Sequence, residues 1–479
     1  MDANTAKDKE GNITDEVWIS HPSNPHNWSP GKKWFQMFAV CYINMWMNMT
    51  GPAYIAGRQY VAKSLNVGTT LSILPTPMST LGLAIGPIIA APMSESIGRL
   101  PVYQTSTPIA VMFLLGSGLT NHIYGVAVCR FFVGLFGGAA SSVGPGGTAT
   151  DIFRPHERAL PLGLFNFMGF AAVPLGFLVS GLSIHYTGDW RYTAWAPSTF
   201  AVIAIVLLLC LQETRRDAIE RRLAHADDSS KWRRFQENLH RTTQLKYLTI
   251  LQRPFRMLLK EPVVTAIGVY TSFSFAVVYG ILAAAPYMFQ TVYGFQLAET
   301  SLTWIVWIIG FLTGASLVTY LQFKLAKALR HKETRDQYLP EWTLKPAMIG
   351  SPLVPIGLFS IAWTARPSVH WIVPVIAMGV YAAGTLLCFN SSLTYLAQYY
   401  GPQYGASATG GARMLSFYLG IAFPLFALPM FETLGIAWSL SLLGFLGLAL
   451  LPTPFLLHKF GPRLRARTKA MQSDATPAS

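Results

Sequence analysis

The chain contains a dozen apolar stretches of about 20 residues or more, separated by polar segments. An α-helix rises about 1.5 Å per residue, so about 20 apolar residues cross the roughly 30 Å hydrocarbon core of a bilayer. The alternating segments of about ten residues that build membrane-spanning barrels do not occur in the sequence. Lipid offers the backbone no hydrogen-bond partners, so each span must be helical. The sequence therefore predicts an all-α integral membrane protein.

The apolar stretches form two groups of six. We expect the spans at residues 34–57, 69–92, 101–120, 123–150, 159–183, 190–211, 262–288, 301–323, 346–365, 370–397, 405–431 and 435–457. The sequence predicts a six-helix bundle at 34–211 and a second one at 262–457, joined by a cytoplasmic linker at 212–261. A cytoplasmic N-terminal tail at 1–33 and a cytoplasmic C-terminal tail at 458–479 flank them. Two halves around a polar linker are typical of alternating-access carriers.

The charged residues lie almost entirely outside these stretches. They make up only 12% of the chain, about half of the roughly 25% that soluble proteins carry. With a cytoplasmic N-terminus, the cytoplasmic segments hold 30 of the 36 Lys and Arg residues, which predicts that both termini are cytoplasmic. The net charge of +14 thus belongs to loops on one side of the membrane, and we reject a nucleic-acid-binding function.

The linker carries opposite charges at helical spacing in the run ETRRDAIERRLAHADDSSKWRRFQENLHR. Such a pattern predicts a solvated surface helix. An interfacial linker helix is the simpler interpretation, and a regulatory or partner-binding segment is the alternative.

The loop after the second span, APMSESIGR, combines a turn residue with charges. It includes Pro92, and Gly98 permits a tight turn between two helices. The Glu95 carboxylate and the Arg99 guanidinium can pair with each other or, for Arg99, with Asp151 at the foot of the fourth span. We expect this cluster to form a cytoplasmic gate, because breaking it would let the two halves part on that side.

This loop resembles the signature loop of the major facilitator superfamily, and the run GPIIAAPMSESIGRLPVY is similar to its fungal drug:proton antiporter branch. Similar segments follow in order along the chain: NPHNWS, RPFRMLLKEPVV, VYGILAAAPYMFQTVYGF, SVHWIVPVIAMGVYAAG and AFPLFALPMFETLGIAWSLSLLGFLGLALLPTPFLLHKFGPRLRARTK. The resemblance extends from about Asn24 to Lys469. It implies twelve helices in two pseudo-symmetric bundles, the major facilitator fold, and proton-coupled export of a small hydrophobic drug, toxin or secondary metabolite.

The motif CRFFVG in the fourth span resembles the intramembrane arginine motif of that family, which implies a role of Arg130 in proton coupling. A fixed cation beside a titrating carboxylate lowers the pKa of that carboxylate, and we expect Arg130 and Asp151 to take part in proton coupling. The alternative is that Arg130 only bonds backbone carbonyls and braces the bundle. Gly134 in the same motif is expected to let helices pack closely.

The sequence departs from the family pattern at three places. The fifth span keeps Gly169, Pro174 and Gly176 but lacks other small residues of the antiporter motif, so packing between the halves should differ and an uptake carrier for a nutrient or vitamin remains an alternative. Leu100 replaces a basic residue of the signature loop. Arg413 lies about one turn before the position at which relatives often have an arginine, which is Ser416 here.

No Asp or Glu lies well inside a predicted span. A carrier of polyamine cations would need buried acids, so neutral or weakly acidic organic molecules are favoured. The residue that carries the proton stays open. Glu95 and Asp151 are candidates by position, and both can equally form gate salt bridges.

We expect polar and aromatic side chains of several spans to line a central cavity. The candidates are Asn48, Asn166, Tyr279, Trp304, Tyr381, Phe389, Asn390 and Tyr418. Asparagine in lipid needs a hydrogen-bond partner, which favours Asn166 and Asn390. Arg413 could attract an anionic substrate group, or it could snorkel or pair structurally.

The chain lacks a phosphate-binding G-x-x-x-x-G-K-[ST] loop, which excludes an ATP-driven pump made of this chain alone. We expect no catalytic residues, metal or cofactor, and as partners a small-molecule substrate, protons and the bilayer, with the chain as a monomer in the plasma membrane. A vacuolar membrane is the alternative location, and a non-transporting membrane sensor is the alternative function.

Overall fold

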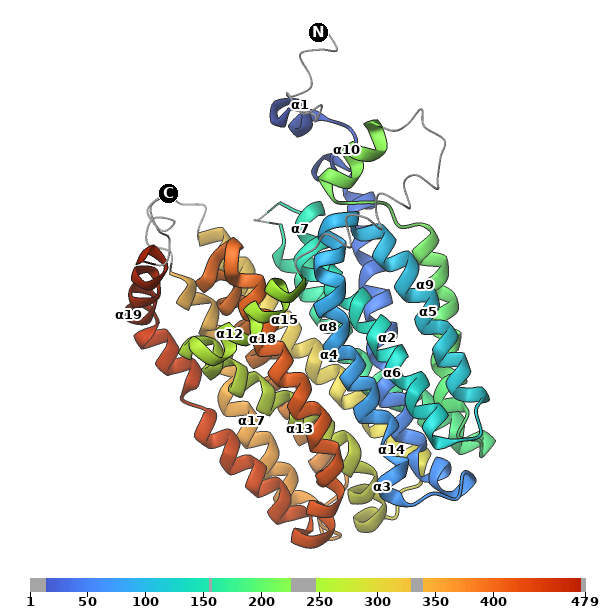
Figure 1. Ribbon diagram of the computed structural model, residues 1–479. Helices are drawn as coiled ribbons and strands as arrows, with labels where there is room; N and C mark the ends of the chain where they lie inside the picture. Colours follow the sequence, from blue (N-terminus) through green and yellow to red (C-terminus); the bar gives the residue numbers. More distant parts are fainter. Residues whose placement is uncertain (1–13, 155–156, 225–246, 329–338, 475–479) are drawn as a thin grey trace.

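The computed structural model describes residues 14–154, 157–224, 247–328 and 339–474, and every regular element in these ranges is a helix. Figure 1 shows two helical bundles side by side, with α1, α10 and α19 at the same end. This end carries the basic loops that are predicted to be cytoplasmic. We call it the basic side, and the opposite end the far side.

The first bundle contains the first six spans. Its long helices are α2 (Pro30–Ser64), α4 (Pro75–Ile97), α5 (Arg99–Leu119), α6 (Ile123–Val143), α8 (Ala159–Thr187) and α9 (Tyr192–Leu209). Its short elements are α1 (Asp15–Ser20), η1 (Pro25–Asn27), α3 (Thr69–Ser72), the π-turn η2 (Gly144–Thr148) and α7 (Ala149–Ile152). In the predicted linker, α10 (Arg216–Ala224) is helical as expected, and the rest of the charged run, from residue 225 on, lies outside the described residues.

The second bundle follows the amphipathic helix α12 (Tyr247–Lys260). Its helices are α13 (Pro262–Tyr293), α14 (Leu297–Thr303), α15 (Ile305–Ala328), η3 (Pro340–Leu344), α17 (Lys345–Thr364), α18 (Ile372–Leu450) and α19 (Thr453–Asp474). The long α18 is broken at Gly401 (φ 67°) and Gly435 (φ 75°), where only glycine adopts the backbone angles easily. It therefore contributes three crossings, the tenth to the twelfth.

Nine helices of the described residues are long and apolar enough to span a membrane. The last of them, 407–466, contains the break at Gly435 and so makes two crossings. The remaining two crossings are α2 and α5, whose polar side chains lower their mean hydropathy. The expected twelve-span bundle is confirmed.

Glycines allow the backbones of α4 and α6 to pack directly against each other. A Cβ atom on Gly82 or Gly86 would collide with the backbone of α6. Reciprocally, a Cβ on Gly134 would collide with the carbonyl oxygen of Ser79, and one on Gly138 would lie 2.8 Å from a carbonyl of α4. Small residues allow this approach, which lets dispersion forces act where lipid provides no hydrophobic drive.

The two halves meet along α8 with α14 and α15, and along α4 with α18. Toward the far side, the rings of Phe177 and Trp304 lie 5.2 Å apart across this interface. On the basic side, none of the ion pairs found between described residues joins the two halves. The described contacts therefore close the middle and the far side in this conformation.

Candidate functional site

Arg130 is fully buried in α6 and is held by the two neighbouring helices of its own half. Its guanidinium donates to the carbonyl of Thr50 (2.5 Å) on α2, and to the carbonyl (2.9 Å) and the hydroxyl (3.3 Å) of Thr193 on α9. It also lies 5.3 Å from the ring centroid of Tyr54. None of the described carboxylates contacts it. The arrangement matches the bracing geometry, in which one charge ties three helices together.

Arg99 at the start of α5 is the centre of the polar cluster on the basic side. Its Nε donates to the carboxylate of Asp151 (3.1 Å) on α7, and its Nη1 donates to Ser94 (2.7 Å) at the end of α4. Thr214 also donates to Asp151 (3.2 Å). Burial raises the pKa of the Asp151 carboxyl above its ordinary value, and the Arg99 guanidinium partly offsets that rise. Glu95 is exposed, and its carboxylate makes no hydrogen bond with any described residue.

Ser94, Arg99 and Asp151 belong to the first half, and Thr214 lies at the start of the linker that follows it. The expected Arg99–Asp151 pair is present, yet in this conformation it joins α5 to α7 and does not join the two halves. Gly98 supplies the turn between α4 and α5 with φ 109°, and Pro92 is buried near the end of α4.

Glu213, which the sequence places only near a span end, belongs to the same cluster. It is buried and accepts hydrogen bonds from the backbone N–H groups of Arg99 (2.9 Å) and Leu100 (3.1 Å). These N–H groups at the N-terminus of α5 have no partners within the helix, and the helix dipole favours an anion there. The position of a lone acid directly after the sixth span was the available signal.

A hydrogen bond between side chains of described residues joins the two halves. The amide of Asn166 on α8 donates to the amide oxygen of Asn390 on α18 at 2.7 Å. Asn48 is satisfied within α2 instead, since it donates to the carbonyl and side-chain oxygens of Asn44 (2.8 and 2.9 Å). Of the candidate asparagines, Asn166 and Asn390 are therefore the two that face each other at the interface.

Aromatic rings from both halves pack against one another at the same interface. Phe170, one turn after Asn166, packs against Phe389 (5.1 Å between centroids) and Phe311 (5.4 Å). Phe275 of α13 continues the group toward Phe389 (6.2 Å), and it packs against Phe417 (5.6 Å) and Tyr279 (4.9 Å) as well. We call these six residues the central aromatic cluster. The sequence did not single out Phe170, Phe275, Phe311 or Phe417, because 62 aromatic residues give such positions no distinguishing pattern.

The other cavity candidates occupy different environments. Tyr381 is fully buried inside the second half and donates to the carbonyl of Ser274 (3.2 Å). Trp304 is fully buried at the contact of the halves toward the far side. Tyr418 lies on an exposed stripe of α18 that also carries Leu425, so its side chain points away from the central aromatic cluster.

The small residues of the fifth span face α2. A Cβ on Gly176 would collide with the carbonyl of Met49, and one on Gly169 would lie 2.9 Å from the Asn44 amide nitrogen. Pro174 lies within α8 between them. These residues set the packing of α8 on α2 inside the first half.

Arg413 stands on the middle segment of α18, between the two glycine breaks. It is half-buried, and its guanidinium makes no hydrogen bond or ion pair with the part of the chain that the structure describes. No group of three or more His, Cys, Asp and Glu side chains among the described residues could hold a metal ion. The candidate site thus consists of the Asn166–Asn390 pair and the central aromatic cluster at the contact of the two bundles. Arg413 lies one helical turn before Phe417 of this cluster.

Similar proteins place this geometry in a known group. Residues 37–424 match the family described as Major Facilitator Superfamily. The chain is 31% identical to an ascochitine biosynthesis cluster MFS transporter of Didymella fabae, over 96% of this chain and 90% of the relative. It is 30% identical to a cycloheximide resistance protein of Candida maltosa (94% and 84% covered) and 30% identical to polyamine transporter 4 of Saccharomyces cerevisiae (95% and 73% covered).

Among solved structures, the proton:xylose symporter XylE bound to 6-bromo-6-deoxy-D-glucose has the same fold. The TM-score is 0.62 at 14% identity, with 90% of this chain and 96% of that chain covered. The family match, the relatives and the twelve-span fold agree. The chain belongs to the Major Facilitator Superfamily.

Proposed function

We propose that the protein is a secondary active transporter that exports small hydrophobic organic compounds in exchange for protons. The relatives whose names refer to a metabolite cluster and to cycloheximide resistance support this substrate class. The observation that carries the proposal is the Asn166–Asn390 hydrogen bond within the central aromatic cluster, at the contact of the two halves. Aromatic walls with a few polar groups are typical of sites for hydrophobic ligands.

Transport by alternating access would move the halves 34–211 and 262–457 as units around this site. The far side is closed by the Phe177–Trp304 contact, so opening toward it requires these two rings to separate. On the basic side, the halves have no ion pair between described residues to break. A substrate would replace the hydrogen bond that the two asparagines now give each other.

For proton coupling we propose Asp151, with Arg130 as a structural support. Asp151 is partly buried, and its raised pKa favours binding of a proton. A protonated Asp151 would release Arg99, whose guanidinium would then have only Ser94 as its side-chain partner. Arg130 contacts no described carboxylate, so its proposed role is to hold α2, α6 and α9 in register.

Uptake of a nutrient or vitamin is the second candidate, and the reduced set of small residues in α8 favours it. Export and uptake can be distinguished with membrane vesicles, because an exporter accumulates its substrate in inside-out vesicles and an uptake carrier does so in right-side-out cells. We expect inside-out plasma-membrane vesicles from a yeast that expresses the chain to accumulate a drug panel when their lumen is acidic. An ionophore that collapses the gradient should abolish accumulation, and vesicles without the protein are the control.

Accumulation that occurs only in right-side-out cells would contradict export. A chain that binds compounds but changes their distribution in neither orientation would indicate a sensor. We place the protein in the plasma membrane as a monomer and assign it transport without catalysis. Fluorescence microscopy of a tagged chain would distinguish the plasma membrane from the vacuolar membrane.

A further inference from the structure

Arg413 lies at membrane depth. The segment of α18 between the breaks at Gly401 and Gly435 rises roughly 50 Å at about 1.5 Å per residue, and the hydrocarbon core takes about 30 Å of this length. Arg413 stands roughly 18 Å above Gly401, about 7 Å on the basic side of the midpoint. Its backbone is therefore inside the hydrocarbon range, where a charged side chain is costly and is by default a functional residue.

Arg413 faces the interior of the protein. One turn further along α18, on the same face, Phe417 contacts Phe275 with 5.6 Å between ring centroids. Two turns further, a Cβ on Gly420 would lie 2.9 Å from Phe275 and 3.9 Å from Thr80 of α4, in the other half. This face of α18 thus meets the central aromatic cluster and the first half.

No described residue balances the charge of Arg413. Arg130, the other arginine within the spans, donates to carbonyls of α2 and α9, whereas the guanidinium of Arg413 makes no hydrogen bond or ion pair with any described residue. In the described helices, the acidic residues of the spans lie near their ends, as Glu95, Glu299 and Glu432 do. Among the described residues, no acid in the interior between the halves neutralises this positive charge.

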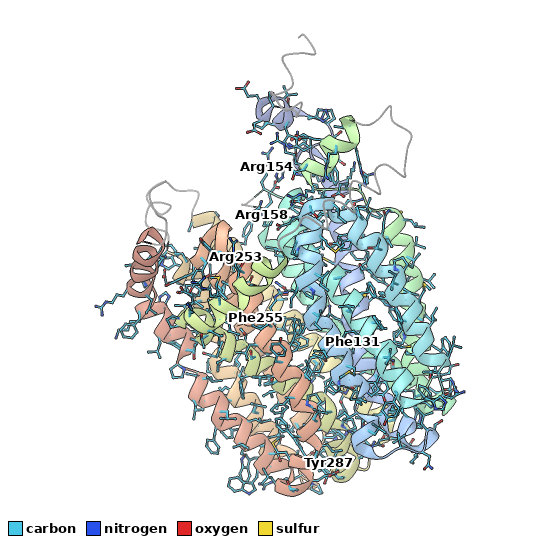
Figure 2. The ribbon with its side chains drawn as sticks, viewed as in Figure 1. Phe131, Arg154, Arg158, Arg253, Phe255 and Tyr287 are labelled. Carbon is cyan, nitrogen blue, oxygen red and sulfur yellow. The ribbon has the colours of Figure 1, made fainter. Side chains whose placement is uncertain are left out.

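Further cations lie on the basic side. Figure 2 shows Arg154 of the first half and Arg253 of α12 on that side of the molecule, above Phe255. Both arginines are exposed, and α12 packs on α18 and touches α4. Exposed cations at this end would raise the local concentration of an anion before it reaches the interior.

We propose that Arg413 makes the central site selective for hydrophobic organic anions, such as aromatic carboxylates or phenolates. The guanidinium pairs with the negative group, and the rings of Phe275 and Phe417 pack against the apolar body. A charge-assisted bond to arginine in a low-dielectric site is stronger than a neutral hydrogen bond. This inference rests on the proposed transport function and adds the charge of the substrate. It also implies that polyamine cations are rejected, unlike in the relative that is named for them.

The test compares matched acid and amide pairs of the same aromatic skeletons, for example 2-naphthoate with 2-naphthamide, in the inside-out vesicle assay at neutral pH. We expect wild-type vesicles to accumulate acids faster than their amides. Arg413→Gln should lower the rate for acids about tenfold or more while amide rates stay within about twofold, since loss of a buried charge partner is costly. Arg413→Lys should retain most of the acid transport, because it keeps the charge.

Arg366→Gln on the far side is the matched control and should leave the transport rates of both the acid and the amide of each pair unchanged. The wild-type preference for acids is measured without any substitution, so it tests the proposal even if Arg413→Gln does not fold. Equal or faster accumulation of amides by the wild type, or an equal loss of both members in Arg413→Gln, would overturn it. Spermidine accumulation would also overturn it. If the vesicles accumulate neither the acids, nor the amides, nor spermidine, the proposed export function itself is wrong.

Discussion

Asn166 and Asn390 lie 224 residues apart in the sequence, yet their side chains share a hydrogen bond of 2.7 Å that joins the two halves. Interhelical hydrogen bonds between side chains in membranes contribute about 0.6 kcal/mol on average and up to about 1.7 kcal/mol. We expect Asn166→Ala and Asn390→Ala each to lower the unfolding free energy by about this amount. The double variant should lose less unfolding free energy than the sum of the two single losses, because either substitution already breaks the bond.

Thermal unfolding of the purified protein in detergent, read as a double-mutant cycle, measures this coupling. Asn48→Ala is the control, since Asn48 bonds only within α2. Strict additivity of the two interface substitutions would show that the bond does not join the halves.

Arg130→Lys should reduce transport about tenfold or more with normal expression. A lysine ammonium is a single point charge and cannot reproduce the fork that reaches Thr50 on α2 and Thr193 on α9 together. Arg130→Ala should also lower stability by about 1–3 kcal/mol, because it removes the donors to buried acceptors. Arg191→Lys, at a partly exposed site on the far side, should change neither transport nor stability. Full activity of Arg130→Lys would contradict the bracing role.

Gly98→Ala should be more harmful than Gly188→Ala. Both glycines have positive φ, at 109° and 72°, so both substitutions introduce backbone strain of about 1–2 kcal/mol. A Cβ on Gly98 would in addition collide with the Glu213 carboxylate that caps α5, whereas a Cβ on Gly188 has open space. Melting temperatures of the two variants and the wild type measure the difference. Equal losses would show that the Glu213 cap can move away at no cost.

Asp151→Asn should flatten the pH dependence of transport. Burial raises the pKa of the Asp151 carboxyl in the folded protein, so the folded state binds this proton more tightly than the unfolded state does. The carboxyl therefore contributes stability that is fully present below the ordinary pKa of an aspartate and is lost as the pH rises through the raised value.

Transport rates and melting temperatures, measured from acidic to neutral pH for wild type and Asp151→Asn, should diverge in that window. Glu95→Gln is the control, because Glu95 is exposed and has no described partner. If Asp151→Asn and wild type have parallel pH profiles, the coupling proton is carried elsewhere.

Much of this architecture could be predicted from the sequence because hydrophobic length and loop charge report directly on the bilayer. The twelve spans follow from these two properties, and Arg99 was expected to pair with Asp151 because both stand at helix ends on the same side. Gly401 and Gly435 appear in the structure where the predicted tenth, eleventh and twelfth spans are separated.

The contacts between halves could not be derived in this way. Whether Tyr418 or Phe417 faces the centre depends on the rotation of α18 about its axis, and packing sets this rotation, which hydropathy does not encode. Both residues are aromatic, and only their contacts separate the exposed Tyr418 from Phe417, which touches Phe275. Likewise, Glu213 caps a helix that begins 114 residues earlier, and no local pattern links the two positions.

The glycine seam between α4 and α6 has a mechanical consequence. At these glycines no side chain separates the two backbones, so we expect the two helices to move together. Helix α4 contacts α18 of the other half, and α6 carries Arg130. We therefore expect a movement of α18 to displace the arginine that ties α2 to α9.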